Sequence, residues 1–436
     1  MTYCEAISYL GSMQRFGIKP GLLRTGSLCL ALGRPERSMG HLHIAGTNGK
    51  GSVAVMCESV IRQAGIKTGL FTSPHLSDYG ERMRVDGEPI RAEELASLTW
   101  KLKQVVDEHV AGGEEPPTEF EICTAMCLDY FRSEGVKLAV MEVGLGGRYD
   151  STNVIDPEAA VITHISYDHM ERLGKSLDLI AFDKCGILKK GAPAVSAMQS
   201  EEAALMIRRE ASAIGSPLSE PGNGYRYKLL GTGLYGTDVE FSGVNVAGSF
   251  RTSLIGTHQA DNAACAIAAI DALVGLGWQI SPKDISLGLK RAAHPGRFEL
   301  IKGDPDVIFD GAHNLDGATA LASTLQNVLG AEKPVAVVGF SKDKDFWNML
   351  KVLSPHLGAV VATAPSHARS GSRDAEAVLE AARGLGLPAT GKPIAGEALE
   401  TGIETALRMG ARLLVCGSLY LVGELRSLHL KRMEVG

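Results

Sequence analysis

HIAGTNGKGSVAVM (residues 43–56) joins a short apolar run to a glycine-rich turn and then to an amphipathic segment. Apolar residues recur three and four positions apart from Val53 to Ala64, which predicts a helix that ends at Gly65. A strand, a glycine-rich turn and a helix in this order are typical of a phosphate-binding loop. Glycines let backbone N–H groups approach an anion closely, and the helix N-terminus adds a favourable dipole.

The turn itself carries the side chains that a nucleotide site needs. Lys50 can reach terminal phosphates, and Ser52 has the chemistry to contact a metal ion or a phosphate oxygen. The spacing departs from the common GxxxxGK[ST] template, because Gly51 separates Lys50 from Ser52. The alternative is a glycine-rich turn that binds nothing. We expect the nucleotide phosphates to contact Thr47, Asn48, Gly49, Lys50, Gly51 and Ser52.

The pattern around this loop predicts an α/β fold in two domains. Apolar runs at 41–45, 67–71, 137–143 and 159–165 alternate with helical segments at 92–109 and 118–134. Such alternation predicts a mostly parallel sheet with helices on both faces. Residues 221–256 read as β-hairpins, followed by helices at 258–275 and 282–292. HPGRFE (294–299) reads as a linker, and further strands are expected at 306–310, 334–340, 359–363 and 412–416.

The predicted domains are an N-terminal P-loop-type domain at 1–293 with a small hairpin region, and a smaller Rossmann-like domain at 297–436. GTGLYG (231–236) matches the GxGxxG dinucleotide pattern, but the residues after it read as a strand. Because no helix N-terminus follows to hold a pyrophosphate, we interpret this segment as a hairpin turn.

Composition and charge narrow the class of protein. The chain has 436 residues, of which 45% are hydrophobic and 22% charged, and its net charge is −6. These values suit a soluble globular protein and give no basic footprint for nucleic acid or for an anionic membrane. The N-terminus lacks a signal-peptide pattern and no apolar run is long enough to span a bilayer. Eight cysteines include no CxxC pair, and Cys123 and Cys127 read as core residues. We therefore expect a cytoplasmic protein.

Three charged residues stand out by their position. Glu142 ends the apolar run LAVMEV, where a metal ion would offset its burial; a solvated strand end is the alternative. Lys184 lies on an apolar helical face, so it must snorkel to solvent, pair or be chemically altered. Asp310 ends the predicted strand 306–310 at the edge where open α/β sheets bind ligands, although it could also belong to a helix N-cap.

GTNGKGS (46–52) resembles the phosphate loop of the Mur ligase superfamily, whose members form amide bonds through acyl phosphates. Further segments resemble the folylpolyglutamate synthase and dihydrofolate synthase branch of that superfamily. They are FGIKPGL (16–22), LFTSPHLSDYGERMRVDGEPI (70–90), MEVGLGGRYDSTNVI (141–155), DHMERLGKSLDLIAFDKCGILKKG (168–191), HQADNAACAI (258–267), HPGRFE (294–299), DGAHNLDGA (310–318) and CGSLYLVGE (416–424).

The resemblance implies ATP-dependent addition of L-glutamate to folates, and it leaves open whether dihydropteroate is also a substrate. It implies that Glu142 and His169 bind Mg²⁺, with Ser73 reaching a second Mg²⁺ position that a carbamylated Lys184 supports. Lys50, His169, Lys184 and Arg297 are the implied catalytic residues, and Asn262, Arg297, Asp310 and His313 the implied ATP contacts. Gly21, Leu22, Thr118, Phe120 and Asp150 are the implied folate contacts, in a monomeric enzyme.

Two positions depart from the family pattern on the folate side. Glu119 stands where an aromatic residue is common, and Tyr149-Asp150-Ser151-Thr152 stands where Leu-Asp-Ala-Thr is usual. Three other functions stay open: a Mur-type ligase acting on cell-wall nucleotides, a P-loop kinase or regulatory ATPase, and an inactive folate- or nucleotide-binding protein. Glutamate-independent ATP turnover would favour the kinase or ATPase.

Overall fold

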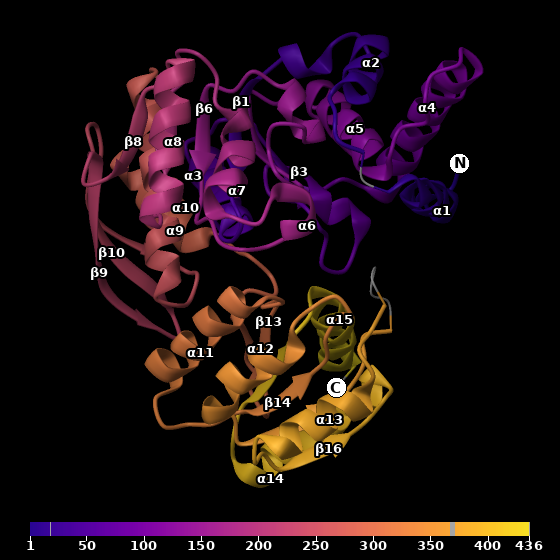
Figure 1. The fold of residues 1–436 in the computed structure, drawn as a ribbon, viewed down its shortest axis with the longest axis vertical. Coiled ribbons are helices and arrows are strands. Elements are labelled where there is room, and N and C mark those ends of the chain that lie inside the picture. The colour runs from indigo at the N-terminus through magenta and orange to yellow at the C-terminus, as the bar shows by residue number, and fades with distance from the viewer. Residues whose placement is uncertain (18, 367–370, 436) are drawn as a thin grey trace. The chain divides into compact units, whose positions relative to one another are not determined.

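The computed structural model of the chain describes residues 1–17, 19–366 and 371–435. The chain forms two compact units. The first comprises Met1–Lys228, Val239–Arg251 and Asp261–Ala292, and the second comprises Leu229–Asp238, Thr252–Ala260 and Ala293–Gly436. Each unit has its own sheet (Figure 1). The second unit thus takes in two short stretches that precede the predicted linker.

The larger sheet, most of which belongs to the first unit, has eleven strands within the described part of the chain, in the order β11-β10-β9-β8-β7-β6-β1-β5-β2-β3-β4. Strand β1 lies between β5 and β6, and both pairings are parallel, as is that of β2 with β5. The predicted parallel sheet is therefore confirmed. The strands are β1 (Gly40–Ala45), β2 (Thr68–Phe71), β3 (Met83–Val85), β4 (Glu88–Pro89), β5 (Leu138–Glu142), β6 (Ala159–Ile162), β7 (Ala194–Ser196), β8 (Leu218–Pro221), β9 (Gly224–Gly233), β10 (Gly236–Ser242) and β11 (Ala247–Thr252).

Helices cover both faces of this sheet. The helices of the first unit are α1 (Tyr3–Met13), α2 (Leu23–Ala31), α3 (Lys50–Gln63), α4 (Ala92–Ala111), α5 (Glu119–Ser133), α6 (Met170–Leu173), α7 (Leu177–Lys184), α8 (Glu201–Ile214), α9 (His258–Gly275) and α10 (Pro282–Arg291), with the first residues of α9 in the second unit. On one face α3 packs on β1 and β5 and against α10, where the Ser59 hydroxyl donates to the Gly288 carbonyl at 2.8 Å.

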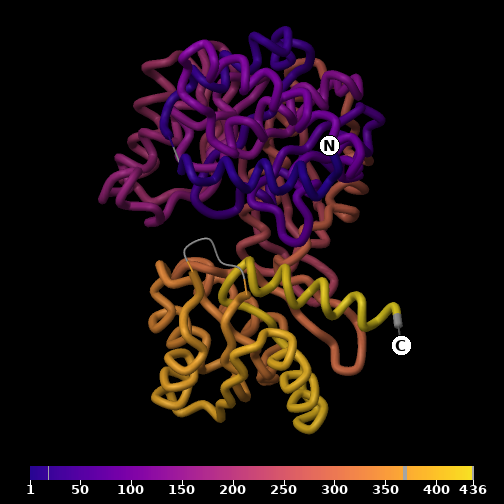
Figure 2. The backbone as a smooth tube through the Cα atoms, turned by 90° about the vertical axis from the view of Figure 1, so that its right-hand side faces the viewer, coloured from indigo at the N-terminus to yellow at the C-terminus, as the bar shows by residue number. Residues whose placement is uncertain are grey.

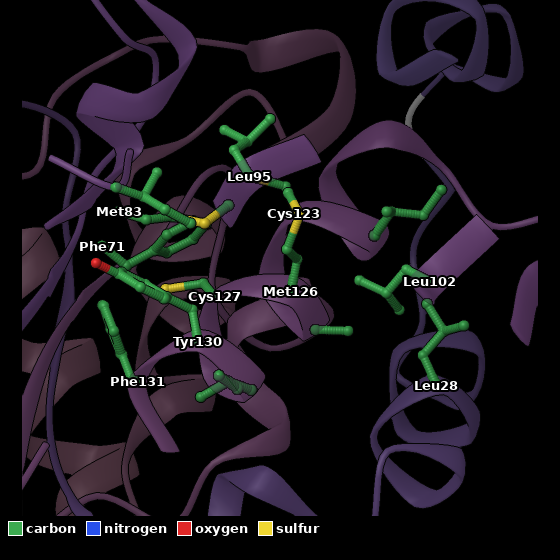
Figure 3. Packing of buried hydrophobic residues seen from close by; sticks show 14 of the residues in the cluster. Leu28, Phe71, Met83, Leu95, Leu102, Cys123, Met126, Cys127, Tyr130 and Phe131 are labelled. Carbon is green, nitrogen blue, oxygen red and sulfur yellow. The ribbon is translucent and has the colours of Figure 1, made fainter. Parts of the chain in front are cut away.

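The opposite face carries a large apolar core. Ala139 and Met141 of β5 join residues of α1, α2, α4 and α5 there. Figure 3 shows part of this core, with Cys123 and Cys127 among its aromatic and aliphatic side chains. Both thiols are fully buried, so the prediction that they are core residues is confirmed. A second cluster on β1 and β6 is covered by α7 and α8, which Figure 1 labels beside these strands.

The segment 231–236 forms a hairpin turn. Strand β9 ends at Gly233 and β10 begins at Gly236, so the intervening turn has two residues. No helix follows, and Tyr235 in the turn is 80% exposed. The interpretation of GTGLYG as a hairpin instead of a dinucleotide fingerprint is confirmed.

The second unit is smaller and combines helices with one sheet. Its sheet has six strands in the described residues, ordered β12-β13-β17-β14-β15-β16, with only β12 antiparallel to its neighbour. The strands are β12 (Glu299–Ile301), β13 (Val307–Asp310), β14 (Val335–Val338), β15 (Ala359–Ala362), β16 (Ala389–Gly391) and β17 (Leu413–Cys416). The helices are α11 (Leu315–Leu329), α12 (Phe346–Leu353), α13 (Ala375–Gly384), α14 (Ala395–Met409) and α15 (Leu419–Val435), the last drawn as the yellow coil of Figure 2.

The apolar runs explain these strands. Residues 335–338 and 413–416 are entirely buried, as expected for central strands of a sheet covered on both faces. The linker is shorter than the predicted range 294–299, because Glu299 is already the first residue of β12. Among the helices that the structure describes, none has the length and apolar character needed to cross a bilayer.

Candidate active site

The phosphate loop is a close-packed turn between β1 and α3. Two of its glycines are required by the backbone and by their neighbours. Gly46 has a φ of 152°, and a Cβ there would lie 1.8 Å from Thr163 Oγ1. Gly49 has a φ of 88°, and a Cβ there would lie 2.3 Å from Asn262 Oδ1. The loop and Asn262 are therefore neighbours, although 213 positions separate Gly49 from Asn262 in the sequence.

The segment after β6 supports the loop. The N–H groups of Thr47 and Asn48 both donate to the His164 carbonyl, at 2.9 and 3.2 Å. The Thr163 hydroxyl donates to the Asn48 carbonyl at 2.8 Å. These bonds fix the turn so that α3 starts at Lys50. The first turn of a helix directs its N–H groups away from the helix body, so the start of α3 suits an anion.

Two lysines converge on one carbonyl oxygen of this loop. Lys50 Nζ donates to the carbonyls of Gly46 and Thr47 at 3.1 and 3.0 Å, and Lys184 Nζ donates to the Gly46 carbonyl at 2.7 Å. Lys184 ends α7 and is only 4% exposed, so it does not snorkel to solvent. Burial first, and then the nearby charge of Lys50, lower the pKa of Lys184 to about 7.

The carboxyl ends of β5 and β2 bring Glu142 to Ser73. Glu142 is 6% exposed at the end of β5, and its Oε2 accepts a hydrogen bond from the Ser73 N–H at 3.2 Å. The alternative of a solvated strand end is therefore wrong for Glu142. A carboxylate and a hydroxyl are hard oxygen donors, and Mg²⁺ binds through one or two carboxylates together with water and phosphate oxygens. Glu142 and Ser73 thus fit Mg²⁺ by their chemistry.

His169 lies in a more open position than Glu142. Its side chain is 51% exposed, and its Nε2 lies 3.9 Å from Asp168 Oδ1. Its backbone is left-handed, with a φ of 50°, which is uncommon for a residue other than glycine. Within the described residues no group of three or more His, Cys, Asp and Glu side chains gathers in a way that could hold a metal ion. The predicted metal residues do not form a cage made of protein alone.

The segments predicted for folate come together on the first unit. The Gly21 N–H donates to the Tyr149 carbonyl at 3.3 Å, which places Gly21 beside the residue that precedes Asp150. A Cβ on Gly144 would lie 2.5 Å from Phe120 Cζ, so the Phe120 ring lies against the backbone of Gly144. Leu22 is the N-cap residue of α2. Ile18, in the same segment, lies outside the described residues.

Two of the predicted folate residues have structural partners. Thr118 caps α5, since its hydroxyl accepts from the Glu121 N–H at 3.3 Å and Glu121 accepts from the Thr118 N–H at 2.7 Å. Asp150 accepts hydrogen bonds from the Leu145 N–H at 2.9 Å and from the Thr152 N–H at 3.0 Å. Burial raises the pKa of Asp150, while these hydrogen bonds act in the opposite direction. Both side chains therefore order the loops of this region.

The nucleotide residues predicted after position 290 gather in the second unit. Asp310 ends β13 and accepts from the Phe298 and Ala312 N–H groups at 2.8 and 2.9 Å. A Cβ on Gly311 would lie 2.7 Å from Arg297 Nη1, so the guanidinium lies over this turn. The N-cap residue of α11 is Asn314, so Asp310 does not cap that helix.

Two histidines accompany Arg297 and Asp310 in this unit. His313 Nδ1 lies 2.9 Å from the Gly311 carbonyl oxygen. His258, the first residue of HQADNAACAI (258–267), is a further neighbour of Arg297. Burial lowers the pKa of His258 to about 4, and the charge of Arg297 adds to this effect. A buried histidine beside an arginine was not predictable from the sequence spacing.

Comparisons with known proteins match both parts of the chain. The family described as Mur ligase middle domain matches residues 44–270, and the family described as Mur ligase, glutamate ligase domain, matches residues 296–419. A Bacillus subtilis protein named dihydrofolate synthase/folylpolyglutamate synthase is 39% identical over 359 residues, which are 80% of this chain and 82% of that protein.

Two solved structures are similar over almost the whole chain. Mycobacterium tuberculosis folylpolyglutamate synthase complexed with ADP and AMPPCP superposes with a TM-score of 0.88 at 30% identity, covering 98% of both chains. An Escherichia coli structure in complex with DHPP and ADP superposes with a TM-score of 0.86 at 29% identity, covering 99% of both chains.

Proposed function

Because the chain belongs to the Mur ligase family, in the branch of folylpolyglutamate and dihydrofolate synthases, we propose that it joins L-glutamate to a folate carboxylate with ATP as the phosphoryl donor. The observation that carries the proposal is the phosphate loop, where Lys50 and the buried Lys184 converge on Gly46. Glu142 at the neighbouring strand end supplies the carboxylate that such a phosphoryl transfer requires.

The first chemical step is phosphoryl transfer. A carboxylate oxygen of the folate attacks the γ-phosphorus, the bond from that phosphorus to the β,γ-bridging oxygen breaks, and ADP leaves. Lys50 leaves the carbonyls of its own loop and neutralises charge on the transferred group, aided by N–H groups at the start of α3. Glu142 and His169 would hold one Mg²⁺ and Ser73 would reach a second, and such an ion would neutralise charge at the phosphate oxygens.

The second step is amide formation. The amine of L-glutamate attacks the carbonyl carbon of the acyl phosphate, the carbon–oxygen bond to phosphate breaks, and the amine proton passes to the released phosphate or to solvent. Asn262, Arg297, Asp310 and His313 are proposed nucleotide contacts, and Gly21, Leu22, Thr118, Phe120 and Asp150 are proposed to line the folate site. Exclusion of water would protect the acyl phosphate from hydrolysis.

Lys184 is proposed to react with CO₂ through its neutral amine. The new nitrogen–carbon bond gives a carbamate, and the amine proton is lost. Burial of Nζ, its lowered pKa of about 7 and the nearby charge of Lys50 support the proposal, because a carbamate would be attracted to Lys50 where an ammonium is repelled. The anion could then support the second Mg²⁺ position together with Ser73.

Dihydropteroate is a second candidate acceptor. The similar Bacillus subtilis protein is named for both synthase activities, and the similar Escherichia coli structure contains DHPP with ADP.

We also propose a monomer in the cytoplasm. The described cysteines are all free thiols, which fits a reducing compartment, and light scattering of the purified protein tests the monomer.

The test is an assay of the purified chain with ATP, Mg²⁺, L-glutamate and either tetrahydrofolate or dihydropteroate. We expect ADP release that depends on both the acceptor and glutamate, together with a product heavier by one glutamyl residue. ADP release without glutamate would point to a kinase or an ATPase. Glutamylation of a cell-wall nucleotide in place of either pterin would identify a different Mur-type ligase.

A further inference from the structure

Glu119, the residue that departs from the family pattern, belongs to a buried network of polar side chains. Its Oε1 accepts hydrogen bonds from Arg82 Nη1 at 3.0 Å and from the Tyr79 hydroxyl at 2.6 Å. Arg82 and Glu119 are 7% and 5% exposed. The Arg82 guanidinium also lies over the Tyr79 ring, 4.6 Å from its centroid. A buried arginine left unpaired would be strongly destabilising, so Glu119 holds Arg82 in this place.

Arg82 in turn fixes the ring of His75. Arg82 Nε donates to His75 Nδ1 at 2.9 Å. An arginine Nε–H is always a donor, so Nδ1 must be the acceptor and the imidazole proton must sit on Nε2. His75 is partly exposed, and its ring also packs on Tyr79 with centroids 5.4 Å apart. Since the Nδ1 side faces the buried arginine, the Nε2–H side is turned away from the network.

The backbone around His75 is held as well. Glu81 accepts hydrogen bonds from the N–H groups of Leu76 and Ser77 at 2.8 and 3.1 Å. The Thr72 N–H donates to the Arg82 carbonyl at 3.1 Å, which closes the 72–82 loop at its base. The histidine therefore stands on an ordered loop, in a fixed orientation and a fixed tautomer.

The network joins two parts of the proposed site. His75 follows Ser73 by two residues, and the Ser73 N–H contacts Glu142. Glu119 lies between Thr118 and Phe120 in the proposed folate region. We propose that His75 binds the folate substrate through Nε2–H, donating to the carboxylate that accepts glutamate, and that Arg82 and Glu119 are positioning residues for it. This inference rests on the proposed function and names a specificity residue for it.

A neutral donor suits the chemistry of that carboxylate. A cation paired with the nucleophilic oxygen would stabilise the ground state and reduce its reactivity, whereas a neutral N–H orients the group with a weaker bond. The charge of Arg82 is already engaged by Glu119. Arg82 therefore pairs with Glu119 and not with the substrate, and its Nε–H orients the His75 ring.

Two isosteric substitutions separate the functions of the two ring nitrogens. His75→Asn keeps an acceptor near the Nδ1 position and removes the outward donor, and His75→Gln keeps a donor near the Nε2 position. Loss of one hydrogen bond to a charged carboxylate, about 1.5–3 kcal/mol, corresponds to about a ten- to hundredfold change in folate KM. We expect that increase for His75→Asn with the ATP KM unchanged, and a smaller increase for His75→Gln.

A double-mutant cycle tests the positioning residues. Glu119→Gln should also raise the folate KM. The double variant Glu119→Gln/His75→Asn should have the same folate KM as His75→Asn alone, because both substitutions act through one donor.

Glu58→Gln is the matched control. Glu58 is a buried carboxylate paired with Arg62 at 2.7 Å on α3, and its loss should lower Tm without changing the folate KM. If Glu119→Gln does not fold, the folate KM values of the two His75 variants test the inference by themselves.

The possible outcomes separate the two proposals. An unchanged folate KM in His75→Asn, or additive effects in the double variant, would overturn the inference in an otherwise active enzyme. A wild-type chain that neither binds folate nor incorporates glutamate would instead overturn the proposed function, and the inference with it.

Discussion

Lys50 and Lys184 donate to the same acceptor, the carbonyl oxygen of Gly46, at 3.1 and 2.7 Å. When both amines are protonated their charges repel each other, and the buried one is poorly screened by water. An anion beside the two amines would relieve this repulsion. A nucleotide phosphate near Lys50 and a carbamate on Lys184 are the two anions proposed above.

Lys50→Ala should abolish ligase activity and leave the fold intact. Removing one preorganised charge partner of a transition state costs about 3–4 kcal/mol, or a 10²- to 10³-fold loss in kcat. Lys67→Ala is the control, because Lys67 forms a partly exposed ion pair with Glu134 on the same unit. Steady-state kinetics and a thermal melt of each variant check this. Substantial turnover by a well-folded Lys50→Ala protein would contradict the phosphate-loop assignment.

Glu142→Gln should raise the Mg²⁺ concentration for half-maximal rate far more than it raises the folate KM. The amide keeps the shape of the carboxylate and loses the charge that attracts a divalent ion. Glu88→Gln, at an exposed position on β4, should leave both quantities unchanged. A Mg²⁺ titration at saturating folate measures the effect, and an unaltered Mg²⁺ requirement would place the metal at other residues.

Gly46→Ala should destabilise the first unit. The new Cβ would lie 1.8 Å from Thr163 Oγ1, on a backbone with a φ of 152°. Overpacking costs about 1–3 kcal/mol, and the unfavourable backbone adds about 1–2 kcal/mol. Thr163→Ala added to Gly46→Ala should restore part of the free energy of unfolding, because it removes the clashing oxygen but not the backbone strain.

The control for Gly46→Ala is Gly26→Ala on α2, where a Cβ would meet nothing within 4 Å. Alanine is preferred over glycine in a helix by about 1 kcal/mol, so this variant should be neutral or more stable. Denaturant melts of wild type, Gly46→Ala, the double variant with Thr163→Ala, and Gly26→Ala measure these changes in the free energy of unfolding. Equal stability of Gly46→Ala and wild type would mean that the loop relaxes at little cost.

Burial of Lys184 should make stability depend on pH. Its folded pKa is about 7, below the value of about 10.4 expected in the unfolded chain. Between these values the unfolded state binds the extra proton, so the destabilisation is greatest below pH 7 and is relieved as pH rises toward 10. Lys184→Met should therefore gain stability over wild type at pH 7, and less so at pH 9. The melts belong in CO₂-free buffer, and a difference independent of pH would contradict the burial argument.

Local pattern predicted the elements that form the scaffold, and long-range contacts decided the details of the site. Apolar residues three and four positions apart from Val53 to Ala64 were enough to predict α3. The apolar run ending at Glu142 was enough to predict β5. Strands such as β7 have only three residues, too few to show a period. The bond from Lys184 to Gly46 spans 138 positions, and the pairing of Glu119 with Arg82 depends on how α5 packs. Neither contact leaves a signal in residue spacing.

The carbamate on Lys184 predicts a chemical rescue. Lys184→Ala should lose activity, because the proposed anion beside Lys50 and the second Mg²⁺ position disappears. The vacated space is buried, close to the Gly46 carbonyl, and near the charge of Lys50, which would attract a small anion. Formate or acetate should restore part of the rate in a saturable way, while chloride at the same ionic strength should not.

Mass spectrometry of the intact wild-type protein after trapping of the carbamate with an alkylating reagent gives a readout independent of activity. A label that appears only with CO₂ and is absent in Lys184→Ala would support the carbamate. An active wild-type protein without any label, together with no rescue by carboxylates, would mean that Lys184 acts as an amine. Its hydrogen bond to Gly46 would then be a structural tie that holds the end of α7 against the phosphate loop.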